Sequence, residues 1–478
     1  MSVSFFQKLA QFQTEKLAPT WHGILTRIGF ILLIVAIMGY LRAERILTVD
    51  NNLGGYAIVS LGFILLVAHN LSIVLAVIGL PHVTSYILTG ILCGPFVFNL
   101  LAEPLVKDLS LVNNLALSLI AFIAGGELRL RTLRERWKSV LFISLFETAV
   151  VFLLCTSSFW FLSRYIPFTA GTSNAFRLAV SLVFGGYIIV NSPAVTIGVI
   201  NEYRPKGPVS QTVLGVVVVK DIIVVLIFSL TVSLAKVLTN PEIKFEIVSF
   251  LLHFGWELLV SSCLGAAVGV VVAIYLKYIK TDLILFTVGV GLLCYQTAKA
   301  LHLDGILLCL VAGFFVENFT RQGETFIQSI EHTLGVVFAI FFSVAGAKMN
   351  LDALQAVWHF ALFFVTVRLL AIYCGSRIGA KLGKAALRVE QYAWLGLVSQ
   401  AGVALGLAVV IEQTFPNWGT NLSTIILALI AMFELIGPLA FRHGLAKSGE
   451  LDLKRVSEDE TLLREWDRSI TPEELFPK

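Results

Sequence analysis

The chain has 478 residues, of which 57% are hydrophobic and only 14% are charged, as 35 basic and 31 acidic side chains. A soluble protein is about 25% charged and about 45–50% apolar. The composition therefore excludes a series of soluble domains, a disordered chain, a disulfide-rich secreted scaffold and a nucleic-acid-binding protein, and it predicts a polytopic membrane protein. The small net charge of +4 indicates no particular partner.

Apolar runs recur along the whole chain, and most approach the roughly 20 residues that a membrane helix needs. We expect an all-α polytopic membrane protein with about 13–14 transmembrane helices. Residues 1–22 are predicted to form a cytoplasmic N-terminal segment, 23–445 the transmembrane domain and 446–478 a short cytoplasmic tail. The apolar runs lie at 23–41, 55–80, 82–98, 109–126, 138–163, 176–200, 209–236, 247–276, 282–300, 304–318, 332–349, 356–377, 391–412 and 420–442.

The distribution of basic residues predicts the orientation, because cytoplasmic loops are enriched in Lys and Arg. If both termini are cytoplasmic, the inside loops hold fourteen of these residues and the outside loops hold eight. The densest inside clusters lie at 129–138 and 377–388. We therefore expect a multi-pass protein of the cell (inner) membrane with both termini in the cytoplasm.

Two pairs of segments indicate an internal repeat. Residues 122–133 (FIAGGELRLRTL) align without gaps on 343–354 (SVAGAKMNLDAL), and residues 86–99 align on 305–318. Seven predicted helices separate the copies, so the two copies would cross the membrane in opposite directions. Inverted repeats of this kind are typical of secondary transporters, which bind substrate near the bilayer midplane.

Two predicted helices contain sequences that interrupt a helix. Asn191, Ser192, Pro193 and Thr196 stand inside the run 176–200, where the proline removes a helical hydrogen bond. Gln400 and Gly402 occupy the corresponding place in the second half. Breaks at matching places in two halves indicate a transporter binding site, although a structural kink without function would give the same pattern.

Five charged residues cannot be placed in loops. Lys220 and Asp221 lie in the middle of the apolar run 209–236, where charges are costly and are usually functional or paired. Asp221 is the best candidate for a carboxylate that alternately holds a proton and an alkali cation. Glu147, Arg368 and Glu434 are buried charges of either structural or transport function, and Arg368 is expected to be a fixed counter-ion paired with Glu147 or Glu434.

The ordered motifs resemble the monovalent cation:proton antiporter superfamily, in particular the antiporter-2 branch with its Kef-type proteins. The resemblance covers residues 55–450 and rests on SYILTGILCGP, FIAGGELRL, NSPAVT, VVKD, FFSVAGAKMNL, VRLLAIYCGSRIGAKLG, SQAGVALGLA and ELIGPLAFRHGLAKSGE. Members of this superfamily carry a required aspartate where Asp221 stands. The preceding position is usually acidic in electrogenic members and Asn or Gln in others, whereas this chain has Lys220.

The resemblance also implies an architecture. It predicts inverted-topology repeats with two crossed discontinuous helices, around Ser192–Thr196 and Gln400–Val403, in a Na+/H+ antiporter-like fold. The core helices would be 138–236 and 356–442, the scaffold and dimerisation helices 23–126 and 282–349, and the linking helix 247–276. A homodimer with elevator-type alternating access follows from the same resemblance.

The leading hypothesis is a secondary active transporter that exchanges Na+ or K+ for H+, electroneutrally, and that is not an enzyme. Asp221 would bind the cation or the proton, with Asn191, Ser192, Thr196 and Lys220 around it, and no cofactor or nucleic acid is expected. One alternative is an anion or organic-anion transporter of the same fold that uses Lys220 and Arg368. The other is a non-transporting or channel-like relative.

Overall fold

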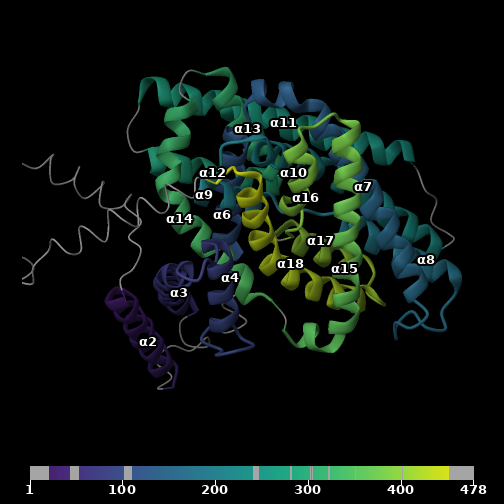
Figure 1. Cartoon of the computed structure of the whole chain (residues 1–478), viewed down its shortest axis with the longest axis horizontal. Helices are drawn as coiled ribbons and strands as arrows, with labels where there is room; N and C mark the ends of the chain where they lie inside the picture. The colour runs from purple at the N-terminus through teal and green to yellow at the C-terminus, as the bar shows by residue number, and fades with distance from the viewer. Residues whose placement is uncertain are drawn as a thin grey trace, which may run out of the picture.

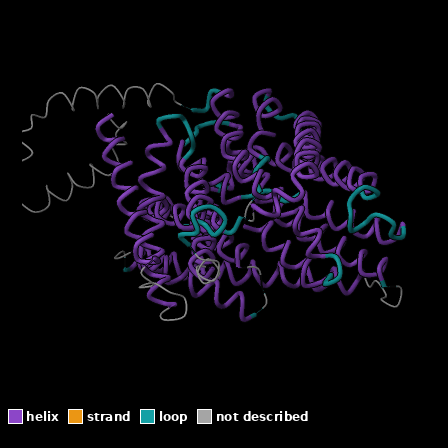
Figure 2. The backbone as a smooth tube through the Cα atoms, turned by 90° about the horizontal axis from the view of Figure 1, so that it is seen from below, coloured by secondary structure: helices purple, strands orange, loops and turns teal. Residues whose placement is uncertain are grey.

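The fold was analysed in a computed structural model that describes residues 21–43, 53–101, 110–240, 247–279, 283–301, 303, 305–320, 323–349, 351–400 and 402–451. The N-terminal segment 1–22, apart from its last two residues, and most of the tail 446–478 lie outside the described residues. In the described ranges the backbone is helical, with short loops and no strand (Figure 2).

Each predicted apolar run coincides with one helix or with a pair of half-helices. In the described part of the chain, eight spans are long and apolar enough to cross a membrane, and further apolar helices are shorter. The all-helical fold class is therefore confirmed. The helices are α2 (Trp21–Ala43), α3 (Leu53–Ala76), α4 (His82–Cys93), α6 (Ser110–Glu127), α7 (Leu130–Leu162), α8 (Asn174–Ile188), α9 (Pro193–Tyr203), α10 (Pro208–Thr239), α11 (Ile247–Tyr278), α12 (Leu283–Ala300), α13 (Gly305–Phe319), α14 (Gly323–Ala347), α15 (Leu351–Leu382), α16 (Leu387–Gly396), α17 (Gly402–Thr414) and α18 (Gly419–Ser448).

Two large hydrophobic clusters define two helix bundles, and a third, smaller cluster joins α2 to α3, α4 and α14. The crossing bundle consists of α7–α10 and α15–α18, and the flanking bundle consists of α3, α4, α6 and α11–α14. Helix α9 lies between them, because Val199 belongs to the first cluster and Ala194, Val195 and Ile197 belong to the second. Figure 1 shows α2 and α3 at one edge of the molecule and α7, α8 and α15 at the other.

Contacts in the flanking bundle display the inverted repeat. The two sequence alignments pair Gly94 with Gly313, and Gly126 with Ala347. A Cβ atom on Gly313 would lie 3.1 Å from the backbone nitrogen of Gly126, and a Cβ atom on Gly94 would lie 3.2 Å from Cα of Ala347. Helix α13 thus packs on α6 as α4 packs on α14. Each half contributes one helix to each pair, as two inverted repeats require.

A stripe of glycines brings α7 and α15 together in the crossing bundle. Gly375 and Gly379 lie four residues apart on one face of α15, and Gly383 follows directly after the end of the helix with the same spacing. A Cβ atom at Gly379 would lie 2.6 Å from Cα of Ile143, and one at Gly375 would lie 2.6 Å from Cα of Glu147. Residue 375 of α15 faces residue 147 of α7, and residue 379 faces residue 143. The numbering increases along one helix as it decreases along the other, so the two helices are antiparallel. Small residues allow this close approach of two helix backbones.

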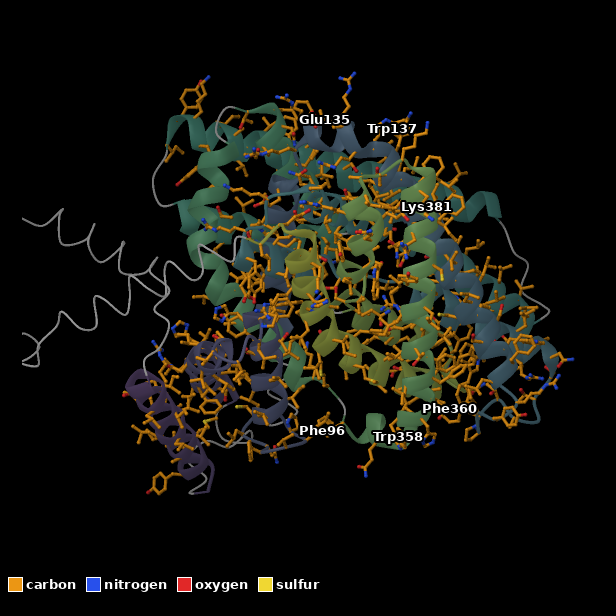
Figure 3. All side chains as sticks on the ribbon, in the orientation of Figure 1. Phe96, Glu135, Trp137, Trp358, Phe360 and Lys381 are labelled. Carbon is orange, nitrogen blue, oxygen red and sulfur yellow. The ribbon has the colours of Figure 1, made fainter. Side chains whose placement is uncertain are left out.

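The ends of the bundles carry aromatic and charged side chains. Glu135, Trp137 and Lys381 lie at one end of the molecule, and Phe96, Trp358 and Phe360 lie at the opposite end (Figure 3). Trp137 and Trp358 are about half exposed. Exposed tryptophans at both ends are typical of the two membrane–water interfaces.

Replacing Gly379 with valine should force α7 and α15 apart, because the new side chain would overlap the backbone of Phe142 and Ile143. Overpacking of this kind lowers the free energy of unfolding by about 1–3 kcal/mol. Thermal unfolding in detergent measures the loss. Gly406→Val in α17 is the control, since nothing lies within 4 Å of its Cβ position. Equal unfolding temperatures for the two variants would contradict the packing described.

Candidate functional site

The two broken helices meet at their breaks in the centre of the crossing bundle. The described residues between α8 and α9 (189–192) and between α16 and α17 (397–400) are non-helical. The backbone N–H of Ser192 donates to the carbonyl of Ser399 at 3.0 Å, and the Asn191 side-chain amide donates to the carbonyl of Leu397. These bonds cross from one break to the other, so the prediction of two crossed discontinuous helices is confirmed.

Local sequence explains where the first break ends. Pro193 is the first residue of α9 rather than a kink within one helix, and proline is favoured there because its missing N–H needs no partner. The Ser192 hydroxyl caps the half-helix by accepting the N–H of Val195 at 3.2 Å. The Thr196 hydroxyl donates to the Ser192 carbonyl at 3.1 Å. Ser192 and Thr196 therefore both hold the start of α9.

Arg368 of α15 binds the carbonyl groups that the breaks leave without helical partners. Its side chain is fully buried. It donates to the carbonyls of Ile188 (2.9 Å), Val190 (2.7 Å) and Val398 (2.6 Å), which belong to both breaks. The guanidinium also lies 4.3 Å from the ring centre of Phe433. The positive charge thus faces the negative ends of α8 and α16, where a helix stabilises a cation.

Gln400, in the second break, donates hydrogen bonds to two of the same carbonyl groups. Its side-chain nitrogen lies 3.3 Å from the carbonyl oxygens of both Ile188 and Val190. Its side-chain oxygen lies 3.5 Å from the Tyr187 hydroxyl. Gly402 begins α17 on the other side of this break.

Lys220 of α10 forms an ion pair with Glu147 of α7. Both side chains are almost fully buried, and the Lys220 ammonium donates to Oε2 of Glu147. Oε1 of Glu147 has no hydrogen-bond partner among the described residues. The pair neutralises two charges that would each be very costly alone in the membrane interior.

This pairing differs from the prediction for Arg368. That side chain was expected to pair with Glu147 or Glu434, but its hydrogen bonds go to backbone carbonyls, and Glu147 instead meets Lys220. Glu434 is fully buried on α18, and neither of its carboxyl oxygens has a hydrogen-bond partner within the described ranges. A counter-ion function for Glu434 therefore has no support in the contacts.

Asp221 follows Lys220 on α10 but has a different environment. It is partly exposed, whereas Lys220 is fully buried. Successive residues of a helix point about 100° apart, so the Asp221 side chain leaves α10 in a different direction from the Lys220 side chain. Helix α10 packs against α8 and α9, which places the carboxylate on a helix adjoining the first break. Oδ1 of Asn191, in that break, is buried and has no hydrogen-bond partner in the described part of the chain.

Glu450 fixes the start of α10, and sequence analysis did not single it out. Its carboxylate accepts the N–H groups of Val209 (2.5 Å) and Ser210 (2.9 Å) and the Ser210 hydroxyl (2.8 Å). Helix α10 begins at Gly207-Pro208 and has no side-chain cap of its own. That missing cap was the available signal, but it did not identify a partner about 240 residues away along the chain.

The comparisons with known proteins agree with this geometry. The model of one protein family, described as "Sodium/hydrogen exchanger, transmembrane", matches residues 62–442. A Na(+)/H(+) antiporter of Enterococcus hirae is 23% identical over 374 residues, which cover 76% of this chain and 92% of that protein. The K(+)/H(+) antiporter 1 of Saccharomyces cerevisiae is 23% identical over 418 residues, 80% of this chain and 47% of that protein.

Among solved structures, this chain is similar to the sodium proton antiporter MjNhaP1 from Methanocaldococcus jannaschii at pH 8. The TM-score is 0.59 at 17% sequence identity, and the match covers 83% of this chain and 98% of that chain. This likeness shows a shared fold.

The Lys220–Glu147 pair should be detectable in a double-mutant cycle. Lys220→Met alone leaves Glu147 as an unpaired buried charge and should lower the free energy of unfolding by about 3–5 kcal/mol. Lys220→Met combined with Glu147→Gln removes both charges and should recover most of that loss. Thermal unfolding of the two single variants, the double variant and the parent gives the coupling. Additive effects would show that the two residues do not interact.

Proposed function

Because this chain belongs to the sodium/hydrogen exchanger family of transmembrane proteins, we propose that it is a secondary active antiporter that exchanges a monovalent cation for H+. It is a transporter rather than an enzyme. The observation that carries the proposal is the crossing of two broken helices, with Asp221 on an adjoining helix, within the part of the chain that matches the family. Relatives named as Na+/H+ and K+/H+ antiporters make Na+ and K+ the cations to test.

Asp221 is the proposed site at which cation and proton compete. A carboxylate holds either a proton or an alkali cation, and this competition couples the two fluxes without a separate gate. Oδ1 of Asn191 and the carbonyls of the first break are the proposed further oxygen ligands. Ser192 and Thr196 are proposed to contribute indirectly, by stabilising the backbone of the first break, because their hydroxyl groups form hydrogen bonds within the first turn of α9.

The charges around Asp221 support one-for-one, electroneutral exchange. Lys220 and Glu147 neutralise each other, and Arg368 is a permanent cation that binds the carbonyls of both breaks. If only Asp221 changes its ligand during the cycle, each cation replaces one proton and no net charge moves.

The same contacts disfavour the anion-transport alternative. An anion site needs positive groups that can turn toward the substrate. Lys220 is held by Glu147, and the Arg368 hydrogen bonds go to three carbonyl groups. Neither residue offers an available cation, so they do not form the anion site that the alternative requires.

The two bundles are the proposed moving parts. We assign the crossing bundle to the transport core and the flanking bundle to the scaffold and dimerisation domain, with elevator-type movement of one against the other. The distribution of basic residues supports cytoplasmic termini and a cytoplasmic location for the end that carries Glu135 and Lys381 (Figure 3). The cell membrane is the proposed location of the homodimer.

Purified protein in proteoliposomes should dissipate a pH gradient when Na+ or K+ is added. Asp221→Asn should abolish this exchange, because an amide, unlike a carboxylate, does not alternate between a proton-bound and a cation-bound form. Glu135→Gln is the matched control, since Glu135 is an exposed carboxylate that pairs with Arg131 within α7. A fluorescent pH indicator inside the vesicles reports the rate. Exchange at the parent rate in Asp221→Asn would refute the assignment.

Lys220→Asp should make the exchange electrogenic, because it adds a second titrating carboxylate beside Asp221 and removes the partner of Glu147. The transport rate of this variant should then depend on an imposed membrane potential, whereas the rate of the parent should not. Lys220→Asn removes the ammonium without adding a carboxylate and separates the two effects. A potential-independent rate in Lys220→Asp would show that position 220 does not set the stoichiometry.

A further inference from the structure

Two charged side chains of the crossing bundle meet the corner between α3 and α4 of the flanking bundle. Both carboxylate oxygens of Glu202, in α9, accept the backbone N–H of His82, at 3.0 and 2.9 Å. Arg442, in α18, packs against Gly79, where a Cβ atom would lie 3.3 Å from its Nη1. Arg442 also lies 5.8 Å from the ring centre of Tyr203, the neighbour of Glu202. In Figure 1 the last part of α18, in yellow, lies beside α9.

The two helix ends at the corner are complementary to the charges of Glu202 and Arg442. Helix α3 is followed by Gly79 at a positive φ of 80°, and the N–H of Leu80 returns to the carbonyl of Leu75 at 3.2 Å. Helix α4 begins after Pro81 and has no side-chain cap of its own. A helix N-terminus favours an anion, and a helix C-terminus favours a cation. Glu202 therefore stands at the positive end of α4, and Arg442 stands at the negative end of α3.

The surrounding contact is close and apolar. Gly198 of α9 faces the flanking bundle, and a Cβ atom there would lie 2.8 Å from Cγ2 of Val83 and 3.4 Å from the ring of Phe342. Val83 is 2% exposed, so the two bundles exclude solvent at this point. The residues that follow α9 include Arg204 and Lys206, which the distribution of basic residues assigns to the cytoplasm.

We propose that Glu202 and Arg442 form a latch that holds the crossing bundle against the α3–α4 corner on the cytoplasmic side and releases it in each transport cycle. The latch rests on the proposed function, because it requires the two bundles to move past each other. Its main bond is the N-terminal cap of α4, in which the carboxylate of Glu202 from α9 accepts the N–H of His82. Loss of such a cap shifts an equilibrium on the order of fivefold, the equivalent of about 1 kcal/mol. A contact of this strength favours one conformation and still allows release.

A cysteine reporter at the sealed contact tests the latch. Val83→Cys is introduced into the full chain after Cys263 and Cys374, the exposed native cysteines, are replaced by serine. Inside-out vesicles are treated with a membrane-impermeant maleimide, and the rate of modification is measured. Glu202→Ala should accelerate modification roughly fivefold, because the released bundle exposes position 83 more often. Glu202→Gln should give a smaller increase, since its oxygen still accepts the N–H but carries no charge.

Glu412→Ala is the matched control. Glu412 lies near the end of α17, the half-helix that corresponds to α9, and its carboxylate has no hydrogen bond or ion pair in the described part of the chain. Its modification rate should equal that of the Val83→Cys parent. If Glu202→Ala fails to yield monodisperse protein, Glu202→Gln and Arg442→Gln provide the comparison.

The outcomes separate the latch from the proposed function. Unchanged modification in the Glu202 and Arg442 variants, together with cation–proton exchange by the parent, would overturn the latch alone. Equal acceleration by Glu412→Ala would also overturn it, because the effect would not depend on the capping contact. If the Glu202 variants accelerate modification but the parent exchanges no cation, antiport is refuted, and with it the release in each transport cycle, while the contact between the two bundles is confirmed.

Discussion

The centre of this fold depends on hydrogen bonds from side chains to buried backbone carbonyl groups. Two helices break inside the membrane domain, and each break leaves carbonyls without helical partners, which is tolerated only where protein or a water-filled cavity satisfies them. Arg368 meets this requirement for both breaks at once, by donating to Ile188, Val190 and Val398. Its buried charge is stabilised by the negative ends of two helices. The crossing therefore requires a cation at this position for structural reasons alone.

This structural use of Arg368 changes the balance of charge in the interior. Since Arg368 binds carbonyls, Glu147 is available to Lys220, and the lysine that stands beside Asp221 becomes part of a neutral pair. Asp221, the next residue on the same helix, is partly exposed. The neutral pair makes a lysine beside the proposed ion site compatible with cation transport.

Sequence patterns were sufficient for the helices, the repeat and the two breaks, because each depends on local composition or on similarity within the chain. The run 176–200 and the residues Asn191–Pro193 located the first broken helix to within a few residues. The partners of the buried charges were not accessible in the same way. Glu147 lies 73 residues from Lys220, and Glu450 caps α10 from the far end of the chain. Helix packing decides these pairings, and several carboxylates and cations were equally suitable from sequence alone.

Glycine contacts of backbone against backbone lie within the bundles. Gly313 meets the backbone of Phe122 and Gly379 meets that of Phe142, while other glycines, such as Gly186 against Thr231, meet side chains. Between the bundles, Gly198 and Gly79 meet only the ends of side chains. Interlocked backbones resist sliding because any displacement produces a clash, whereas side-chain ends can change rotamer at small cost. Each bundle is therefore stiff inside, and the surface between them is the more adaptable one. Rigid bodies that meet at a small number of releasable polar contacts are suited to domain movement, and the α3–α4 corner provides such contacts on one side of the membrane.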